Sequence, residues 1–188
     1  GLELATVSSS DAGKVHADWP SMAVVGDAQA LFADPTLDLI VIPTPNDTHF
    51  PLAQQALAAG KHVVVDKPFT VTLSQAQALQ QQAQQSGLLL SVFHNRRWDS
   101  DYLGVKQVIE QGLIGKVTHF ESHIDRYRPE VRVRWREQNL PGSGLWFDLG
   151  PHMVDQALQL FGLPHSVQAN IATLRPNAQV NDWAHVVL

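Results

Sequence analysis

The chain contains no cysteine, so neither a disulfide framework nor a thiolate metal site can form. No apolar run approaches the roughly 18 residues of a membrane span, and no secretory signal pattern opens the sequence. There is also no basic run of the kind that marks nucleic-acid binding. We therefore expect a cytoplasmic protein that binds neither nucleic acid nor a membrane.

The composition that remains is that of a globular protein. The sequence has 188 residues, of which 44% are hydrophobic and 16% charged, and its formal net charge is −5. This length is enough for a sizeable core, in one domain and part of a second.

The first half alternates strand-like and helical segments. Thr72 with Gln75 three residues later is a capping-box signature, and Gly87 is a typical helix end. Strands are predicted at residues 2–7, 22–25, 38–42, 62–65 and 88–93, with helices between them. Such alternation with short connections implies right-handed βαβ units, so we predict an α/β, Rossmann-like doubly wound parallel sheet over residues 1–115.

The second half has a different pattern. Residues 117–127 alternate polar and apolar side chains, which predicts a strand with one solvated face, and Pro151 suits the first turn of a helix that runs to Phe161. Further strands are predicted within residues 165–174 and 183–188. Residues 116–188 are therefore expected to form part of an α+β domain with a large, mostly antiparallel sheet.

Lys67 lies where a buried strand ends. The apolar run 62–65 is followed by Asp66, Lys67 and Pro68, and Pro68 has no N–H for a sheet ladder. Ligands of open α/β sheets bind outside the carboxyl ends of the strands, so Lys67 is a candidate for chemistry. Taken alone, however, Lys67 is better explained as a solvated lysine at a strand end than as a catalytic residue.

Asp148 and His152 stand four residues apart on the predicted helix. At this spacing both side chains project from the same face, so the carboxylate can orient the imidazole and favour its charged form. Histidine commonly serves as a general base. The other interpretation is an N-capping aspartate and a surface histidine.

A polar turn follows the clearest strand, residues 38–42. Thr44 and Asn46 lie where a β-to-α loop meets a cofactor in a doubly wound fold. The same residues are also typical of a simple reversing turn.

Four motifs carry a resemblance. Thr44-Pro45-Asn46 with His49, Asp66-Lys67-Pro68, Asn95-Arg96-Arg97-Trp98 and the run from Asp148 to Asp155 occur in the order and spacing of the Gfo/Idh/MocA oxidoreductases. The match covers nearly the whole chain and most resembles the bacterial members that handle scyllo-inositol and its ketone with NADP. The resemblance implies hydride transfer between a nicotinamide cofactor and a sugar or polyol.

The resemblance also implies the site residues. Lys67 would polarise the substrate oxygen, His152 would be the general acid and base, and Asp148 would orient both. The nicotinamide side would be lined by Thr44, Pro45, Asn46, His49, Asp66 and Pro68, with Lys67. Arg97 and Trp98 would contact cofactor or substrate, and Arg126 and Tyr127 would bind substrate beside Asp148 and His152.

The end of the second strand of the expected fold bears on the cofactor. An acid normally holds the ribose 2′-hydroxyl of NAD there, and this sequence has Ser8, Ser9 and Ser10 instead. Hydroxyl groups and the nearby Lys14 suit a 2′-phosphate, whereas Asp11 favours NAD. We predict NADP as the preferred cofactor, with NAD as the alternative.

Two departures from the family pattern stand out. Asp66 replaces the glutamate that commonly precedes the Lys-Pro pair. A Gly-rich turn is expected before Leu2, no G-x-G-x-x-G loop occurs, and both ends of the sequence look cut. We interpret the missing turn as truncation.

Other functions remain open from the sequence. The same fold serves a non-catalytic nucleotide-binding regulator and a glycosidase that borrows the nicotinamide, and an inactive fragment is a further possibility. The polar side chains His119, Glu121, His123 and Asp125 are expected to face substrate or an interface, with no metal. We expect a homodimer or homotetramer formed through the second-domain sheet.

Overall fold

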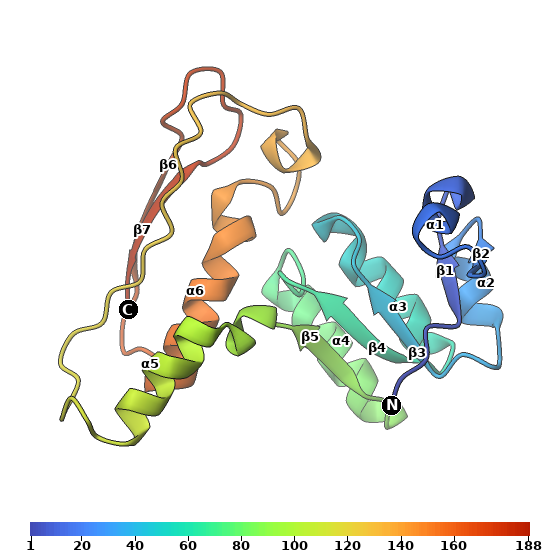
Figure 1. Cartoon of the computed structure of the whole chain (residues 1–188), viewed down its shortest axis with the longest axis horizontal. Helices are drawn as coiled ribbons and strands as arrows, with labels where there is room; N and C mark the ends of the chain where they lie inside the picture. Colours follow the sequence, from blue (N-terminus) through green and yellow to red (C-terminus); the bar gives the residue numbers. More distant parts are fainter. The chain divides into compact units, whose positions relative to one another are not determined.

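The computed structural model describes residues 1–188 and divides into two compact units, Gly1–Val92 (unit 1) and Phe93–Leu188 (unit 2) (Figure 1). This division lies upstream of the boundary predicted at residue 115. The reason is that the short 3-10 helix η2 (Asn95–Trp98) contacts both α5 (Ser100–Glu110) and α6 (Leu145–Phe161). Residues 93–115 therefore pack with the second half of the chain.

Unit 1 alternates strands and helices as predicted. Its elements are β1 (Thr6–Ser8), α1 (Ala12–Asp18), β2 (Ala23–Val25), α2 (Ala28–Ala33), β3 (Leu39–Ile42), η1 (Asn46–Thr48), α3 (His49–Ala58), β4 (His62–Asp66), α4 (Leu73–Ser86) and β5 (Leu90–Phe93). Strand β1 pairs with β2 and β3 pairs with β4, both in parallel, and β5 lies on the other side of β4. This arrangement confirms the Rossmann-like α/β prediction.

The core of unit 1 lies between the three-stranded sheet and its helices α3 and α4 (Figure 1). Alternate strand residues point into it, Ile40 and Ile42 from β3 and Val63 and Val65 from β4. Each fully buried aliphatic side chain contributes about 1.5–3 kcal/mol. The loops that leave β3 and β4 therefore start from a rigid base.

Helix α4 of unit 1 begins and ends at the residues that the sequence predicts. The Thr72 hydroxyl accepts the Gln75 main-chain N–H, and the Gln75 side chain accepts the Thr72 N–H, which completes the capping box of α4. The helix ends at Gly87, whose φ of 65° lies in the left-handed region that favours glycine.

Unit 2 contains helices and a separate antiparallel sheet. Besides η2, α5 and α6 it has η3 (Trp135–Glu137), β6 (Gln168–Ala172) and β7 (Trp183–Val187), and β6 pairs with β7 in antiparallel fashion. The strand predicted at residues 117–127 is wrong, because that segment forms no hydrogen-bonded ladder. Its alternation persists only in part: Ser122 and Ile124 are half-buried while His123 is exposed.

The position predicted for Pro151 is also wrong. Helix α6 begins at Leu145, so Pro151 lies inside it. Asn181 makes the earlier start possible, because its main-chain oxygen accepts the Leu145 N–H and its Oδ1 accepts the Trp146 N–H, each at 2.8 Å. These bonds satisfy main-chain donors that have no partner within the helix.

The helices of both units are short or polar. The longest, α6, has 17 residues and includes Asp148 and Asp155. None of the helices has the length and apolar character that a bilayer span requires.

Candidate functional site

His49 joins the two loops that leave β3 and β4 in unit 1. Its ring is fully buried, with Nδ1 at 2.8 Å from the Pro68 carbonyl oxygen and Nε2 at 2.9 Å from the Thr44 carbonyl oxygen. The ring therefore lies between the two carbonyl oxygens, and the tautomer determines which ring nitrogen donates. The loops that contain Thr44 and Lys67 are therefore held against each other at one edge of the sheet.

The β3 loop has its own internal bonds. The Thr48 hydroxyl donates to the Pro45 carbonyl oxygen at 2.7 Å and lies 2.6 Å from the Thr44 hydroxyl. The Thr48 main-chain N–H also donates to Pro45, and Asn46 is buried. The polar turn predicted after residues 38–42 is thus held by its own hydrogen bonds at the carboxyl end of β3.

The β4 loop carries Lys67. The Lys67 main-chain N–H donates to Asp66 Oδ1 at 2.8 Å, and the Lys67–Pro68 peptide bond is cis. Asp66 and Lys67 are half-buried, while Pro68 is buried. Lys67 therefore occupies the strand-end position that the sequence predicts.

The end of β1 holds the residues predicted to select the cofactor. The Ser9 hydroxyl donates to the Asp11 carbonyl oxygen and accepts the Asp11 N–H, both at 3.1 Å. The Asp11 carboxylate caps α1 by accepting the Lys14 main-chain N–H at 3.0 Å. The Lys14 side chain is exposed and forms no ion pair, so a cation lies one turn beyond Ser8 and Ser9.

Asp148 and His152 lie one turn apart on α6 of unit 2. His152 is buried, and the Asp148 carboxylate lies 3.5 Å from the Arg136 guanidinium. Gly150 is required between them, since a Cβ there would stand 2.6 Å from the Trp146 ring. Trp146 thus packs against the helix turn that carries both side chains.

Arg97 is held by Asp155, a residue for which no individual role is predicted from the sequence. Its guanidinium donates to both carboxylate oxygens of Asp155, at 2.7 and 2.6 Å, and this bidentate bond raises the pKa of Arg97. Gln156 donates to the Arg96 carbonyl oxygen at 2.8 Å. The only sequence feature that pointed to Asp155 is its position as the last residue of the fourth motif. Trp98, by contrast, is 74% exposed.

The predicted substrate residues lie on the surface of unit 2. Arg126 is exposed and Tyr127 is 94% exposed. In the neighbouring polar segment the Glu121 carboxylate lies 3.0 Å from His119 and 3.5 Å from His123. The structure contains no group of three or more side chains suited to hold a metal ion.

The candidate site therefore consists of two sets of residues. The structure brings Thr44, His49 and Pro68 together in unit 1, next to Lys67. Asp148 and His152 belong to unit 2. A catalytic group made of Lys67, Asp148 and His152 would need residues of both units.

Comparison with known protein families gives two matches. Residues 1–94 match the model of a family described as an oxidoreductase family with an NAD-binding Rossmann fold. Residues 102–188 match the model of the GFO/IDH/MocA C-terminal domain. Together the two matches cover most of the chain.

Individual relatives agree. The chain is 63% identical to the uncharacterized oxidoreductase YdgJ of Escherichia coli over its whole length, which is 54% of that protein. It is 38% identical to the scyllo-inositol 2-dehydrogenase (NADP(+)) IolW of Bacillus subtilis, with 99% of this chain and 52% of that protein covered. A solved oxidoreductase structure from Yersinia pestis is 69% identical, with a TM-score of 0.94 over 100% of this chain and 53% of that one. The chain spans about half the length of these relatives.

Proposed function

The chain belongs to the Gfo/Idh/MocA oxidoreductase family, and on that basis we propose that the protein is an NADP-dependent dehydrogenase acting on a sugar or polyol. The reaction would interconvert a ring hydroxyl group and a ketone, as in an inositol. The observation that carries the proposal is the pair of loops clamped by His49, because it fixes Lys67 at the edge of the sheet where ligands of this fold bind.

The residues of unit 1 fit a nicotinamide cofactor. Thr44, Pro45 and Asn46 on one loop and Asp66 and Pro68 on the other would line the nicotinamide. His49 would act differently from its neighbours, since both its ring nitrogens are occupied by carbonyl oxygens. It would hold the two lining loops in place rather than contact the cofactor.

The end of β1 supports NADP over NAD. One oxygen of the Asp11 carboxylate is used to cap α1, where it accepts the Lys14 N–H. Ser8, Ser9 and the exposed Lys14 offer hydroxyl groups and a cation for a 2′-phosphate. The name of the IolW relative as an NADP(+) enzyme is consistent with this choice.

The nicotinamide, when bound, supplies or accepts a hydride at its C4 atom. The Lys67 ammonium group would stabilise the negative charge that develops on the substrate oxygen. His152 would take or give the hydroxyl proton, and Asp148 would favour its charged form. Arg97, oriented by Asp155, and Trp98 would contact cofactor or substrate, while Arg126 and Tyr127 would contact the rest of the substrate.

The sheet of unit 2 supports self-association. Trp183 and Val187 lie four positions apart on β7, on one face of the sheet, and are each at least one-third exposed. Apolar side chains on a sheet face are typical of subunit contacts. We propose a homodimer or homotetramer through this sheet, which light scattering on the purified protein would measure.

The test is NADP reduction with a panel of inositols, other polyols and sugars. We expect the Lys67→Met and His152→Asn variants to lose about 100- to 10,000-fold in kcat while still binding NADPH. Lys106→Met, which removes a half-exposed lysine of α5, is the matched control and keeps full activity. Activity that survives in both Lys67→Met and His152→Asn would refute the assigned roles.

A further inference from the structure

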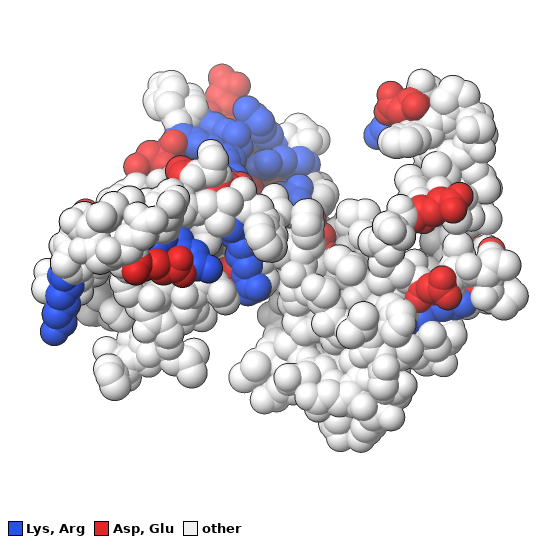
Figure 2. Space-filling model, turned by 60° about the horizontal axis from the view of Figure 1, so that its bottom comes forward, with Lys and Arg blue, Asp and Glu red and all other residues white.

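Positive charge is concentrated in one segment of unit 2. Five of the eleven residues from 126 to 136, here called the arginine segment, are arginines, although the whole chain carries a net charge of −5. Arg126, Arg128 and Arg132 form no ion pair with the rest of the protein. Figure 2 shows Lys and Arg side chains gathered on one part of this unit.

The other two arginines of the segment are paired. Arg134 donates to Glu137 at 3.1 Å, and the Arg136 guanidinium lies 3.5 Å from the Asp148 carboxylate while it stacks over the Trp135 ring. The remaining three arginines, Arg126, Arg128 and Arg132, form no ion pair. The charge of Arg132, followed by burial and the charges of Arg126 and Arg134, lowers the pKa of Arg128, while the charge of Asp148 acts in the opposite direction.

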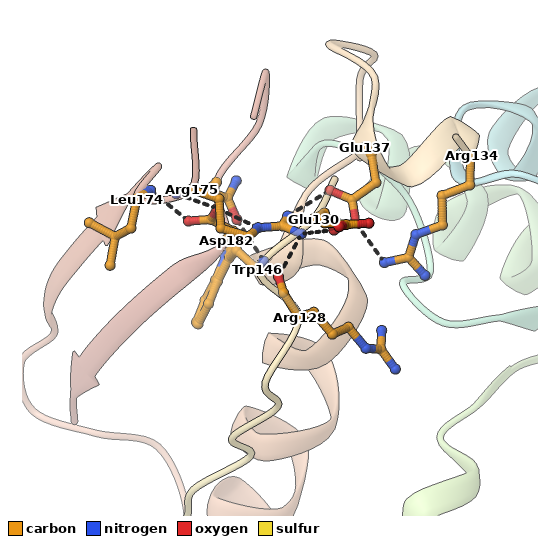
Figure 3. Close-up of polar contacts among 9 residues, drawn as sticks. Arg128, Glu130, Arg134, Glu137, Trp146, Leu174, Arg175 and Asp182 are labelled. Atoms are coloured by element: carbon orange, nitrogen blue, oxygen red, sulfur yellow. Dashed lines mark hydrogen bonds and ion pairs between the residues drawn. The ribbon is translucent and has the colours of Figure 1, made fainter. Parts of the chain in front are cut away.

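The backbone of the segment is fixed from within by Arg175 (Figure 3). The Arg175 guanidinium donates to the carbonyl oxygens of Arg128 at 3.4 Å and Glu130 at 3.3 Å. It also pairs with the buried carboxylates of Asp182 at 2.8 Å and Glu137 at 2.7 Å. The unpaired arginines therefore project from an anchored backbone rather than from a freely moving loop.

A small cavity lies at the same segment. It has a volume of about 170 Å³ and is lined by Arg132, Arg134, Glu137, Gln138, Asn177 and Gln179, with two valines. One carboxylate oxygen of Glu137 is bound to Arg134 and the other to Arg175, so the cavity lining otherwise offers arginine and amide groups. Pockets that enclose a whole ligand measure roughly 300–1,000 Å³. This cavity suits one polar group of a larger molecule.

We propose that Arg128 and Arg132, with Arg126 beside them, bind an oxyanionic group, a phosphate or a carboxylate, carried by the sugar or polyol substrate. Guanidinium groups recognise both anions through paired N–H donors. Arg128 and Arg132 form no ion pair and flank the backbone that Arg175 holds at Arg128 and Glu130, so their donors are available for that contact. The inference rests on the proposed dehydrogenase function for the identity of the substrate. It narrows the substrate class to sugar phosphates and sugar acids.

Calorimetric titration without cofactor tests the site. Glucose 6-phosphate and gluconate are compared with neutral glucose, and inorganic phosphate shows whether the anion alone is sufficient. We expect both anionic sugars to bind and glucose not to bind. Arg128→Gln and Arg132→Gln should each weaken binding by about tenfold or more, because each removes a charge-assisted contact. Arg132→Lys keeps the charge but loses the paired donors, and should weaken binding as well.

The matched control is Lys106→Gln, which removes one positive charge from α5 of the same unit. If it weakens binding as much as Arg132→Gln, the effect is diffuse attraction and the inference fails. Equal affinity for glucose and glucose 6-phosphate would also overturn it. Tighter binding of inorganic phosphate than of either sugar would exclude an anionic sugar as the ligand.

The NADPH affinity of the same variants separates the two proposals. If NADPH fails to bind while glucose 6-phosphate binding depends on Arg132, the dehydrogenase function fails and the anion site stands. If NADPH binds and neutral polyols are oxidised without any preference for anionic ones, the dehydrogenase stands and the anion site fails.

Discussion

The two units position their functional residues by different means. Unit 1 places Lys67 on loops that rest on an apolar core, in which ten side chains are buried. In unit 2 only Tyr102, Leu149 and Val180 are buried hydrophobic residues. There, Arg97 is held by Asp155, and the arginine segment is held by Arg175 with its two carboxylates.

This difference determines which changes of pH, salt or sequence should destabilise each unit. Apolar burial does not depend on pH or salt over ordinary ranges, whereas buried ion pairs are strong only while both partners are charged. Core mutations should therefore destabilise unit 1, whereas acid and the loss of an ion pair should destabilise unit 2. Hydrogen exchange read by mass spectrometry assigns each effect to its unit.

The largest effect is expected from breaking the ion-pair network of unit 2. The Asp182→Ala variant leaves the Arg175 charge with only Glu137 and removes the acceptor of two main-chain N–H groups, those of Leu174 and Arg175. Removing one partner of a buried pair costs about 3–5 kcal/mol. Glu110→Ala, which breaks the exposed pair with Lys106, is the control and should change stability by less than about 1 kcal/mol. Equal urea midpoints for the two variants would contradict this account of unit 2.

A similar or slightly smaller loss is expected from a cavity in unit 1. Leu57 on α3 is fully buried, so Leu57→Ala should lower the free energy of unfolding by about 2–5 kcal/mol. Leu73→Ala on α4 removes an exposed leucine and serves as control. Faster exchange is expected in β3 and β4 of unit 1. Loss of protection confined to unit 2 would contradict the assignment of Leu57 to the core of unit 1.

Acid should act on unit 2 through Asp182. Burial alone would raise the pKa of Asp182, but hydrogen bonds from Leu174 and Arg175 outweigh it, and the pKa is lowered from its ordinary value of 3.8. A depressed folded-state pKa stabilises the protein above that ordinary value, and this stability is lost as pH falls through the folded pKa. Exchange in β6 and β7 should therefore accelerate below about pH 4. The Asp182→Asn variant should show no such acceleration. If exchange in this variant still accelerates at low pH, another group is responsible for the effect.

The smallest effect is expected near pH 6, from His94. Burial lowers the pKa of His94, against the opposing charge of Asp155. The unfolded chain then takes up a proton at a higher pH than the folded chain, so stability should fall slightly as pH drops below about 6.5. The midpoint of thermal unfolding, recorded between pH 7.5 and 5.5, measures this loss of stability. His94→Gln should flatten the profile, and an unchanged slope would rule out His94 as the cause.

What the sequence predicts well is local. The capping signal of Thr72 and the helix end at Gly87 are confirmed, because each depends on residues within one helical turn. The parallel sheet follows from the alternation of strands and helices. The prediction of a strand at residues 117–127 is wrong, because alternating polar and apolar side chains identify two faces of a segment but not a second strand to which it can hydrogen-bond.

The remaining features depend on distant residues. Arg97 meets Asp155 across 58 positions, and Arg175 meets Glu137 across 38. Asn181 caps α6 from the connection between β6 and β7, which is why the helix starts before Pro151. A sequence motif can indicate that such a residue has a role, but only the fold shows which distant side chain or main-chain group it contacts.

The most direct test of the proposed function is a fluorescence titration with NADPH and, separately, NADH, followed by energy transfer from the tryptophans. The account predicts saturable binding that is tighter for NADPH, with the difference reduced in Lys14→Gln and unchanged in Lys106→Gln. Binding of neither cofactor, or equal affinity for both, would contradict an NADP-dependent dehydrogenase.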